Sequence, residues 1–232
     1  MNKKFDDLVS QSQDISIFEK PSMNEISSYS ITQKSKLVKY LDMTGMINLE
    51  DYTPIDFESL KVNFWKKDNM EKIKIMNGFF WRIAKAKDVK SRRMNIAAIL
   101  KNDILGLQSG NIDELLASRQ LMKPTLRLIN SMAMDKYGRN IIFTNTNMYR
   151  DILALIGNCS DETCLQYIMV IIEFLSAETY FKKVLLDYDI ISIFVSLLRE
   201  EDVCRNEVIV ENIVAALLNL TDREEGIKMF RK

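Results

Sequence analysis

The chain of 232 residues contains no histidine. Histidine is the commonest general base near neutral pH and a frequent metal ligand, so its absence removes the simplest route to either chemistry. The three cysteines, Cys159, Cys164 and Cys204, are too few for a structural zinc site, and their odd number disfavours a disulfide framework. The few glycines are too scattered to form a phosphate-binding loop. We therefore predict a protein that is not an enzyme, with no catalytic residues, metal or cofactor.

Glycine and proline are scarce, with seven and three residues respectively. An all-β fold needs many tight turns built from these residues, so the composition disfavours it. No segment approaches the ~20 consecutive apolar residues that span a bilayer, and the first residues lack the apolar segment of a secretory signal. The odd cysteine count indicates a reducing compartment. We expect a cytoplasmic protein without a membrane span.

A faint repeat runs through the second half of the chain. Three similar stretches begin at Leu128, Ile171 and Leu217, separated by 43 and 46 residues, and Gly138 and Gly226 lie 88 residues apart. Spacings of ~40–47 residues filled with a helical pattern are typical of armadillo and HEAT solenoids. The sequence thus predicts an all-α, armadillo/HEAT-like right-handed α-solenoid with a helical, partly irregular N-terminal extension.

The chain divides into three parts by composition and periodicity. Residues 1–32 are polar and serine-rich and are expected to form a flexible arm. Residues 33–93 form a helical N-terminal region with a basic block, and residues 94–232 hold the armadillo-like repeats. Helices are expected at about 33–45, 69–87, 137–145, 147–157, 160–177, 179–187, 189–200 and 206–220, with a further helix ending near Met132.

The segment Leu217–Thr221, preceded by two alanines, resembles the third-helix signature of armadillo repeats. Residues 95–232 also resemble the C-terminal armadillo region of the LisH-domain armadillo family of basal bodies and cilia, at Arg127–Asn130, Gly138-Arg139 and Leu198–Asp202. The resemblance implies a scaffold or adaptor in a stable ciliary, basal-body, axonemal or other microtubule-associated assembly, with tubulin or ciliary proteins as partners. The LisH motif itself is matched only faintly, at Leu37–Leu41.

The same resemblance points to partner-binding residues. In peptide-binding armadillo proteins, the asparagine of the third-helix motif lines the concave groove and hydrogen-bonds an extended peptide through its amide. Nuclear-import adaptors add a tryptophan four residues earlier, which this chain lacks, so import-type cargo binding is disfavoured. A general cytosolic adaptor for extended peptides remains an alternative to an assembly subunit. The groove candidates are Asn130, Glu173 and Asn219, and the tryptophan positions hold Leu126, Met169 and Ala215.

Charge is unevenly distributed although the net charge is zero. Residues 61–93 carry eleven basic and three acidic side chains, interleaved with aromatic residues, whereas the segments on either side are acidic. The pattern is compatible with an amphipathic helix that has a solvated basic face, with a surface for an acidic protein partner, or with nucleic-acid binding, which we consider the weakest of the three. The candidate residues are Lys66, Lys67, Lys72, Lys74, Arg82, Lys85, Lys87, Lys90, Arg92 and Arg93.

Overall fold

The computed structural model of the chain describes residues 55–145, 148–222 and 226–228. The flexible arm predicted at 1–32 and the helix predicted at 33–45 lie outside these residues. A second unit of the chain, Phe57–Lys232, is compact and holds every helix described below. The division predicted between residues 93 and 94 falls inside this second unit.

All regular secondary structure among the described residues is helical. The helices are α4 (Phe57–Asn63), the 3₁₀ helix η2 (Phe64–Lys66), α5 (Asn69–Ala84), α6 (Val89–Lys101), α7 (Ile112–Ala117), α8 (Met122–Ala133), α9 (Lys136–Asn145), α10 (Met148–Ile156), α11 (Glu162–Ser176), α12 (Thr179–Asp187), α13 (Ile190–Leu197), α14 (Glu201–Arg205) and α15 (Glu207–Leu220).

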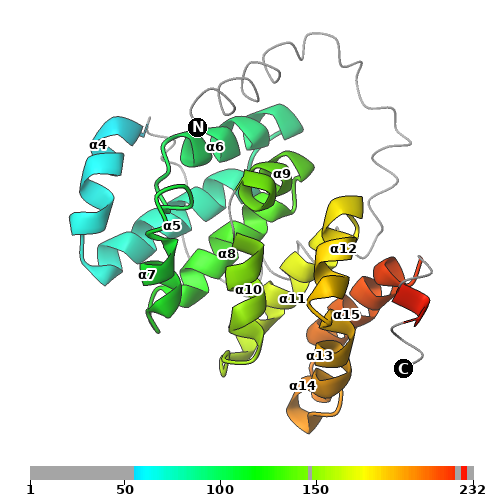
Figure 1. Ribbon diagram of the computed structural model, residues 1–232. Helices are drawn as coiled ribbons and strands as arrows, with labels where there is room; N and C mark the ends of the chain where they lie inside the picture. Colours follow the sequence, from blue (N-terminus) through cyan, green and yellow to red (C-terminus); the bar gives the residue numbers. More distant parts are fainter. Residues whose placement is uncertain (1–54, 146–147, 223–225, 229–232) are drawn as a thin grey trace, which may run out of the picture. The chain divides into compact units, whose positions relative to one another are not determined.

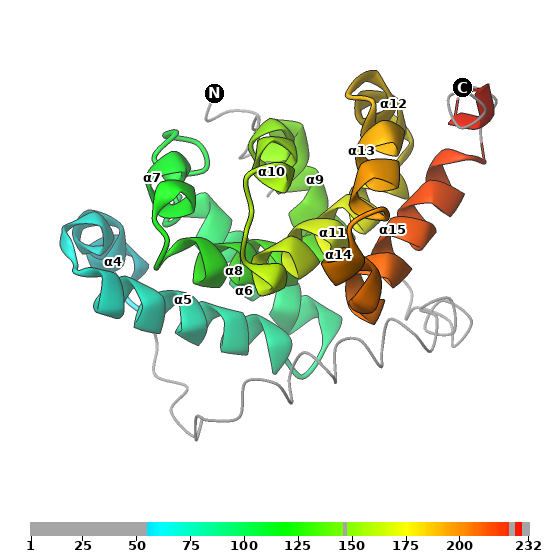
Figure 2. The same cartoon turned by 90° about the horizontal axis from the view of Figure 1, so that it is seen from below.

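The helices form repeating units of three. The units are α6-α7-α8, α9-α10-α11 and α12-α13-α15, with α14 as a short addition to the last unit and α4 and α5 ahead of the first (Figure 1). The third helices α8, α11 and α15, together with α5, pack side by side in chain order. Figure 2 shows these four long helices as a row, with α7, α10 and α13 together on one side of it. The unit is therefore an armadillo-like α-solenoid, as the sequence predicts.

Polar residues at the joints fix where three of the long helices begin. The side chains of Asp68, Asp161 and Asn206 each accept a hydrogen bond from the backbone N–H three residues further on, at 2.8, 2.9 and 3.1 Å. Each such cap contributes about 1 kcal/mol, because it satisfies a backbone donor that the first turn leaves free. At the joint of residues 159–161, the capping residue of α11 is Asp161.

Gly138 and Gly226 occupy equivalent places in the repeat. A Cβ atom at Gly138 would lie 2.2 Å from the carbonyl oxygen of Met132, and one at Gly226 would lie 2.1 Å from that of Leu220. In both cases the glycine lies six residues after the carbonyl group that it contacts, and that carbonyl group is at the end of the preceding long helix. The two contacts give the first and third units a register of 88 residues, which aligns Asn130 with Leu218.

Three ion pairs join successive units at matching places. Arg93 of α6 pairs with Asp135, with an N–O distance of 3.2 Å. Arg139 of α9 pairs with Glu178 at 3.0 Å, and Lys182 of α12 pairs with Asp222. In each pair a basic residue on the first helix of one unit meets an acidic residue that follows the next long helix. The ion pairs thus repeat with the fold and link neighbouring units in order.

Candidate functional site

The four long helices share a face that points away from the core. On α8 the core side carries Leu126, Ile129 and Met132, all fully buried. Lys123, Arg127 and Asn130 follow each other at i, i+4 and i+7, so they form one stripe on the other side of α8. The corresponding stripes of the other long helices add further polar residues. We call this set the long-helix strip: Lys74 and Asn77 of α5, Lys123, Arg127 and Asn130 of α8, Glu173 of α11, and Glu211 and Leu218 of α15.

The three predicted groove residues do not share one environment. Asn130 is 6% exposed, whereas Glu173 is half-buried on α11. Asn219 turns toward α11 instead, where its Nδ2 donates a hydrogen bond to Ser176 Oγ at 3.0 Å. The glycine register places Leu218, which is 67% exposed, at the position equivalent to Asn130. The packing register thus differs by one residue from the sequence pattern, which pairs Asn130 with Asn219.

The side-chain carbonyl of Asn130 is the most unusual polar group of the strip. Its Oδ1 is buried and has no hydrogen-bond partner within residues 55–145, 148–222 and 226–228. A buried acceptor left without a donor costs about 1–3 kcal/mol, which is why such groups are rare in folded proteins. An N–H group of a bound molecule would satisfy this oxygen.

Arg127 lies one turn before Asn130 and is not among the partner-binding candidates predicted from the sequence. Its guanidinium carbon lies 4.4 Å from the centroid of the Phe80 ring, and its Nη2 donates a hydrogen bond to Asn77 Oδ1. Its Nε is buried without a hydrogen-bond partner. Among the described residues no carboxylate pairs with this cation, and burial lowers the pKa of Arg127. The side chain is therefore a half-buried, oriented cation without a counter-charge.

The positions that hold tryptophan in import adaptors belong to the core here. Leu126 and Met169 are buried at 0% and 1% exposure, and Ala215 is half-buried. No aromatic platform replaces them on α8 or α15, because neither helix contains an aromatic residue. The strip is suited to polar and ionic contacts and not to stacking on the aliphatic part of lysine side chains.

The predicted basic surface is distributed over several elements. Lys66, Lys67 and Lys72 lie around the start of α5, whereas the residues from Arg82 to Arg93 lie at its far end and on α6. A helix of 16 residues is about 24 Å long, so the two groups are well separated.

Several members of the basic block already have partners within the fold. Arg93 pairs with Asp135, and Lys67 pairs with Glu71 at 3.5 Å. Lys72 and Lys85 lie over the rings of Trp65 and Trp81 at 5.6 and 5.1 Å. The aromatic residues of this region are mostly buried, which removes the exposed rings that base stacking needs; the buried ones are Phe64, Phe79, Phe80 and Trp81.

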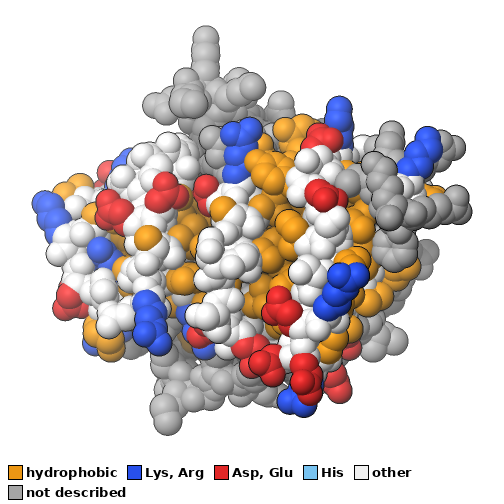
Figure 3. All heavy atoms as spheres, turned by 60° about the horizontal axis from the view of Figure 1, so that its bottom comes forward, with side chains coloured by type: hydrophobic (Ala, Val, Ile, Leu, Met, Phe, Trp, Pro, Cys, Tyr) orange, Lys and Arg blue, Asp and Glu red, His pale blue; other side chains and the backbone are white. Residues whose placement is uncertain are grey.

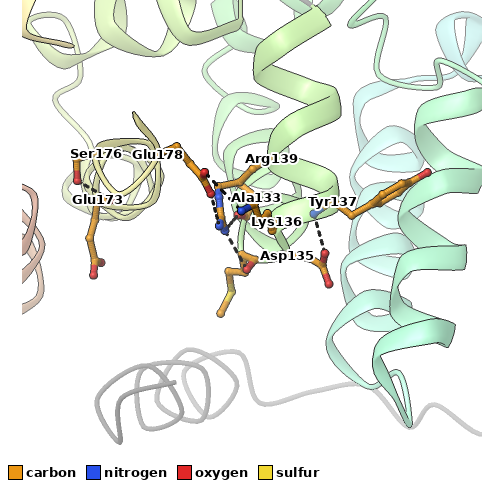
Figure 4. Close-up of polar contacts among 9 residues, drawn as sticks. Ala133, Asp135, Lys136, Tyr137, Arg139, Glu173, Ser176 and Glu178 are labelled. Atoms are coloured by element: carbon orange, nitrogen blue, oxygen red, sulfur yellow. Dashed lines mark hydrogen bonds and ion pairs between the residues drawn. The ribbon is translucent and has the colours of Figure 1, made fainter. Parts of the chain in front are cut away.

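Arg139 connects the end of the first unit with the joint between the second and third units (Figure 4). Its Nη1 donates hydrogen bonds to the carbonyl oxygens of Ala133 and Met134, at 2.8 and 3.2 Å, and thereby caps the end of α8. Its Nη2 reaches Glu178 Oε1, and its guanidinium carbon lies 5.4 Å from the centroid of the Phe174 ring. Figure 4 shows Glu173 pointing away from this joint. Arg139 therefore has a structural role, and Glu173 stays on the strip.

The face shown in Figure 3 has a different character. Apolar side chains gather there in furrows between rows of polar side chains and backbone. Furrows of this kind are expected where helices of neighbouring units lie side by side and the core residues between them come close to the surface. The buried polar atoms that lack partners among the described residues belong instead to α8 and α9.

Within the described residues, no helix is long and apolar enough to cross a membrane, and no three histidine, cysteine, aspartate or glutamate side chains gather as a metal site.

Comparison with known proteins shows a likeness to solved structures but no related sequence. No protein-family model matches the sequence, and neither does any curated protein. Among solved structures, the chain is similar to a designed armadillo repeat protein, YIII(Dq.V1)4CPAF, determined in complex with the peptide (KR)4. The identity is 17%, the match covers 82% of each chain, and the TM-score is 0.39.

Proposed function

We propose that this protein is a non-catalytic interaction scaffold that binds an extended segment of a partner protein along the long-helix strip. The observation that carries the proposal is the buried Asn130 Oδ1, for which the described residues offer no hydrogen-bond donor. An extended peptide presents an unpaired N–H and C=O group at every residue, so it supplies the donor that this oxygen lacks.

The arrangement of the strip suits such a ligand. Lys123 Nζ donates a hydrogen bond to Thr163 Oγ1 of α11 at 3.1 Å, and Arg127 is tied to Asn77 of α5. These bonds hold side chains from neighbouring units in fixed positions. A preorganised row of polar groups binds a peptide with less loss of side-chain entropy than a mobile surface does.

The test is selection of peptides from a phage-displayed library of random 12-residue sequences on the full-length protein. Selected peptides are then measured by fluorescence anisotropy against the wild type and Asn130→Ala. Loss of one hydrogen bond to a buried amide should weaken binding about tenfold. Ser192→Ala, an exposed residue on α13, is the matched control and should bind like the wild type. Failure to select any peptide, or equal affinity of Asn130→Ala, would contradict the proposal.

For the cellular setting, we propose a stable ciliary, basal-body or other microtubule-based assembly, with tubulin or ciliary proteins as partners. The support is the resemblance of residues 95–232 to the LisH-domain armadillo family. Imaging of the tagged full-length chain in ciliated cells, before and after detergent extraction, tests this placement. Extraction-resistant signal at basal bodies or axonemes is the expected result. Diffuse, extractable signal would instead favour a general cytosolic adaptor with the same peptide-binding strip.

A further inference from the structure

We infer that the long-helix strip takes a peptide with an acidic residue, and that the carboxylate of this aspartate or glutamate binds Arg127. The inference rests on the proposed function, because it assigns the chemistry of one position within the bound peptide. It adds a ligand class that the asparagine pattern does not give, since an amide accepts any peptide backbone whereas a guanidinium selects an anion.

The first support is the state of the Arg127 guanidinium. The Phe80 ring lies 4.4 Å from its central carbon and fixes its plane, while Asn77 Oδ1 occupies one N–H of Nη2. Nε has no partner. A guanidinium held in one plane with free N–H groups is ready to form the parallel pair of hydrogen bonds that a carboxylate accepts.

The second support is the missing counter-charge. No described carboxylate pairs with Arg127, and the group that most favours its charged form is the Tyr167 hydroxyl, whereas burial disfavours that form. A half-buried cation without a partner loses hydration and gains little in return. A bound carboxylate would supply the partner, and removing the remaining water would strengthen the pair further.

The third support is the charge order along the strip. The exposed residues Lys74 and Lys123 lie on α5 and α8 with Arg127, whereas Glu173 and Glu211 lie on α11 and α15. The strip therefore changes from basic to acidic as the long helices succeed each other. A peptide lying across the row would match it best with its acidic residue over α5 and α8 and a basic residue toward α15.

Arg127 also ties α5 to α8 through Asn77, so a purely structural role is the competing explanation. A structural tie would affect stability but not which peptides are selected. The experiment therefore repeats the 12-residue library selection on the wild type, Arg127→Gln and Arg127→Lys, with the melting temperature of each variant recorded. Arg127→Lys keeps the charge but not the planar pair of donors. This variant still tests the acidic preference if Arg127→Gln fails to fold.

The expected result is aspartate or glutamate at one fixed position of the peptides selected on the wild type, with loss of that preference on Arg127→Gln. Replacing this residue by asparagine or glutamine should weaken binding to the wild type about tenfold or more, and to Arg127→Gln less than twofold. Arg127→Lys should keep a weaker acidic preference. If the peptides selected on the wild type bind it but share no acidic residue, this inference alone is overturned. If no peptide is selected on the wild type, the proposed function is overturned.

Discussion

At the scale of single residues, Gly138 and Gly226 are required by space and not by backbone conformation. Each packs against a carbonyl oxygen that a Cβ atom would meet at about half of its usual contact distance, at 2.2 and 2.1 Å. The first helix of the unit would have to move away from the preceding long helix to admit a methyl group. That movement would also disturb the ion pair made by Arg139, which directly follows Gly138.

We predict that Gly138→Ala lowers the free energy of unfolding by about 1–3 kcal/mol, although alanine favours helix formation. Gly78→Ala in the interior of α5 is the control, because nothing lies within 4 Å of its added methyl group. That variant should be stabilised by about 0.5–1 kcal/mol through helix propensity. Urea unfolding followed by circular dichroism measures both. Equal effects of the two substitutions on the free energy of unfolding would contradict a steric requirement for glycine at position 138.

Two thiols at the start of α11 differ in reactivity for a local reason. A hydrogen bond with Cys164 holds the pKa of the Cys159 thiol down to about 7, while the same contact and burial raise the pKa of Cys164. When the pair loses its first proton, Cys159 becomes the thiolate. The remaining proton stays on Cys164 and is shared through the hydrogen bond between the two sulfur atoms. Only the thiolate is alkylated at an appreciable rate.

We predict that Cys159 is alkylated by iodoacetamide with a rate that rises through a midpoint near pH 7. The measurement uses a Cys204→Ser background, because Cys204 is exposed and would contribute to the signal. Cys164→Ala removes the donor and should move the midpoint toward higher pH, closer to that of an ordinary thiol. A midpoint unchanged by Cys164→Ala would rule out the shared proton.

At the scale of elements, most helices are predictable from the pattern of apolar residues. The helices predicted at about 137–145, 147–157, 160–177, 179–187 and 206–220 are confirmed within two residues at each end. The predicted helix at 189–200 ends earlier, at Leu197, and the five-residue α14 follows it. Short helices such as α14 and η2 escape prediction because a single turn has no periodicity to detect.

The chemistry of the strip was harder to predict than its helices. Asn130 is a predicted groove residue because it lies in a recognisable motif, whereas Arg127 looks like any surface arginine of an amphipathic helix. Its distinguishing property is that Phe80 and Asn77, some fifty residues earlier, orient it, while no carboxylate in the described part of the chain neutralises it. Such a property depends on packing between units, and the local sequence contains no signal for it.

We predict that the joint at Arg139 contributes more to stability than an exposed ion pair of the same charges. Arg139 is 12% exposed and holds two backbone carbonyls as well as Glu178, so Arg139→Ala should lower the free energy of unfolding by about 2–4 kcal/mol. Arg205→Ala breaks the exposed pair with Glu201 and should cost less than about 0.5 kcal/mol. Chemical denaturation of both variants is the measurement, and similar losses would contradict a special role for Arg139.

At the scale of the whole molecule, the solenoid should be most stable in its middle. α11 has neighbours on both sides, α8 and α15, and ten of its fifteen residues are buried, whereas α4 has no buried residue. In a stack where each unit contacts only its neighbours, local opening starts at the units with the fewest contacts.

We therefore predict that amide hydrogens of α11 exchange most slowly and those of α4 fastest among the described helices. Hydrogen exchange followed by mass spectrometry on the full-length chain gives this order directly. Uniform exchange across α4, α8 and α11 would indicate a single cooperative unit in place of a stack of coupled ones.

The central claim is that a partner peptide lies on the long-helix strip, and site-specific photo-crosslinking tests it most directly. A photoreactive benzoylphenylalanine is placed at Lys123, at Leu218 or at Ser192 of the full-length protein, and a library-selected peptide is added. Lys123 and Leu218 are exposed on the strip, whereas Ser192 is exposed on α13 in the row beside it. Crosslinks from the first two positions and none from Ser192 are the predicted result. Crosslinks from Ser192 without any from Lys123 or Leu218 would contradict the claim.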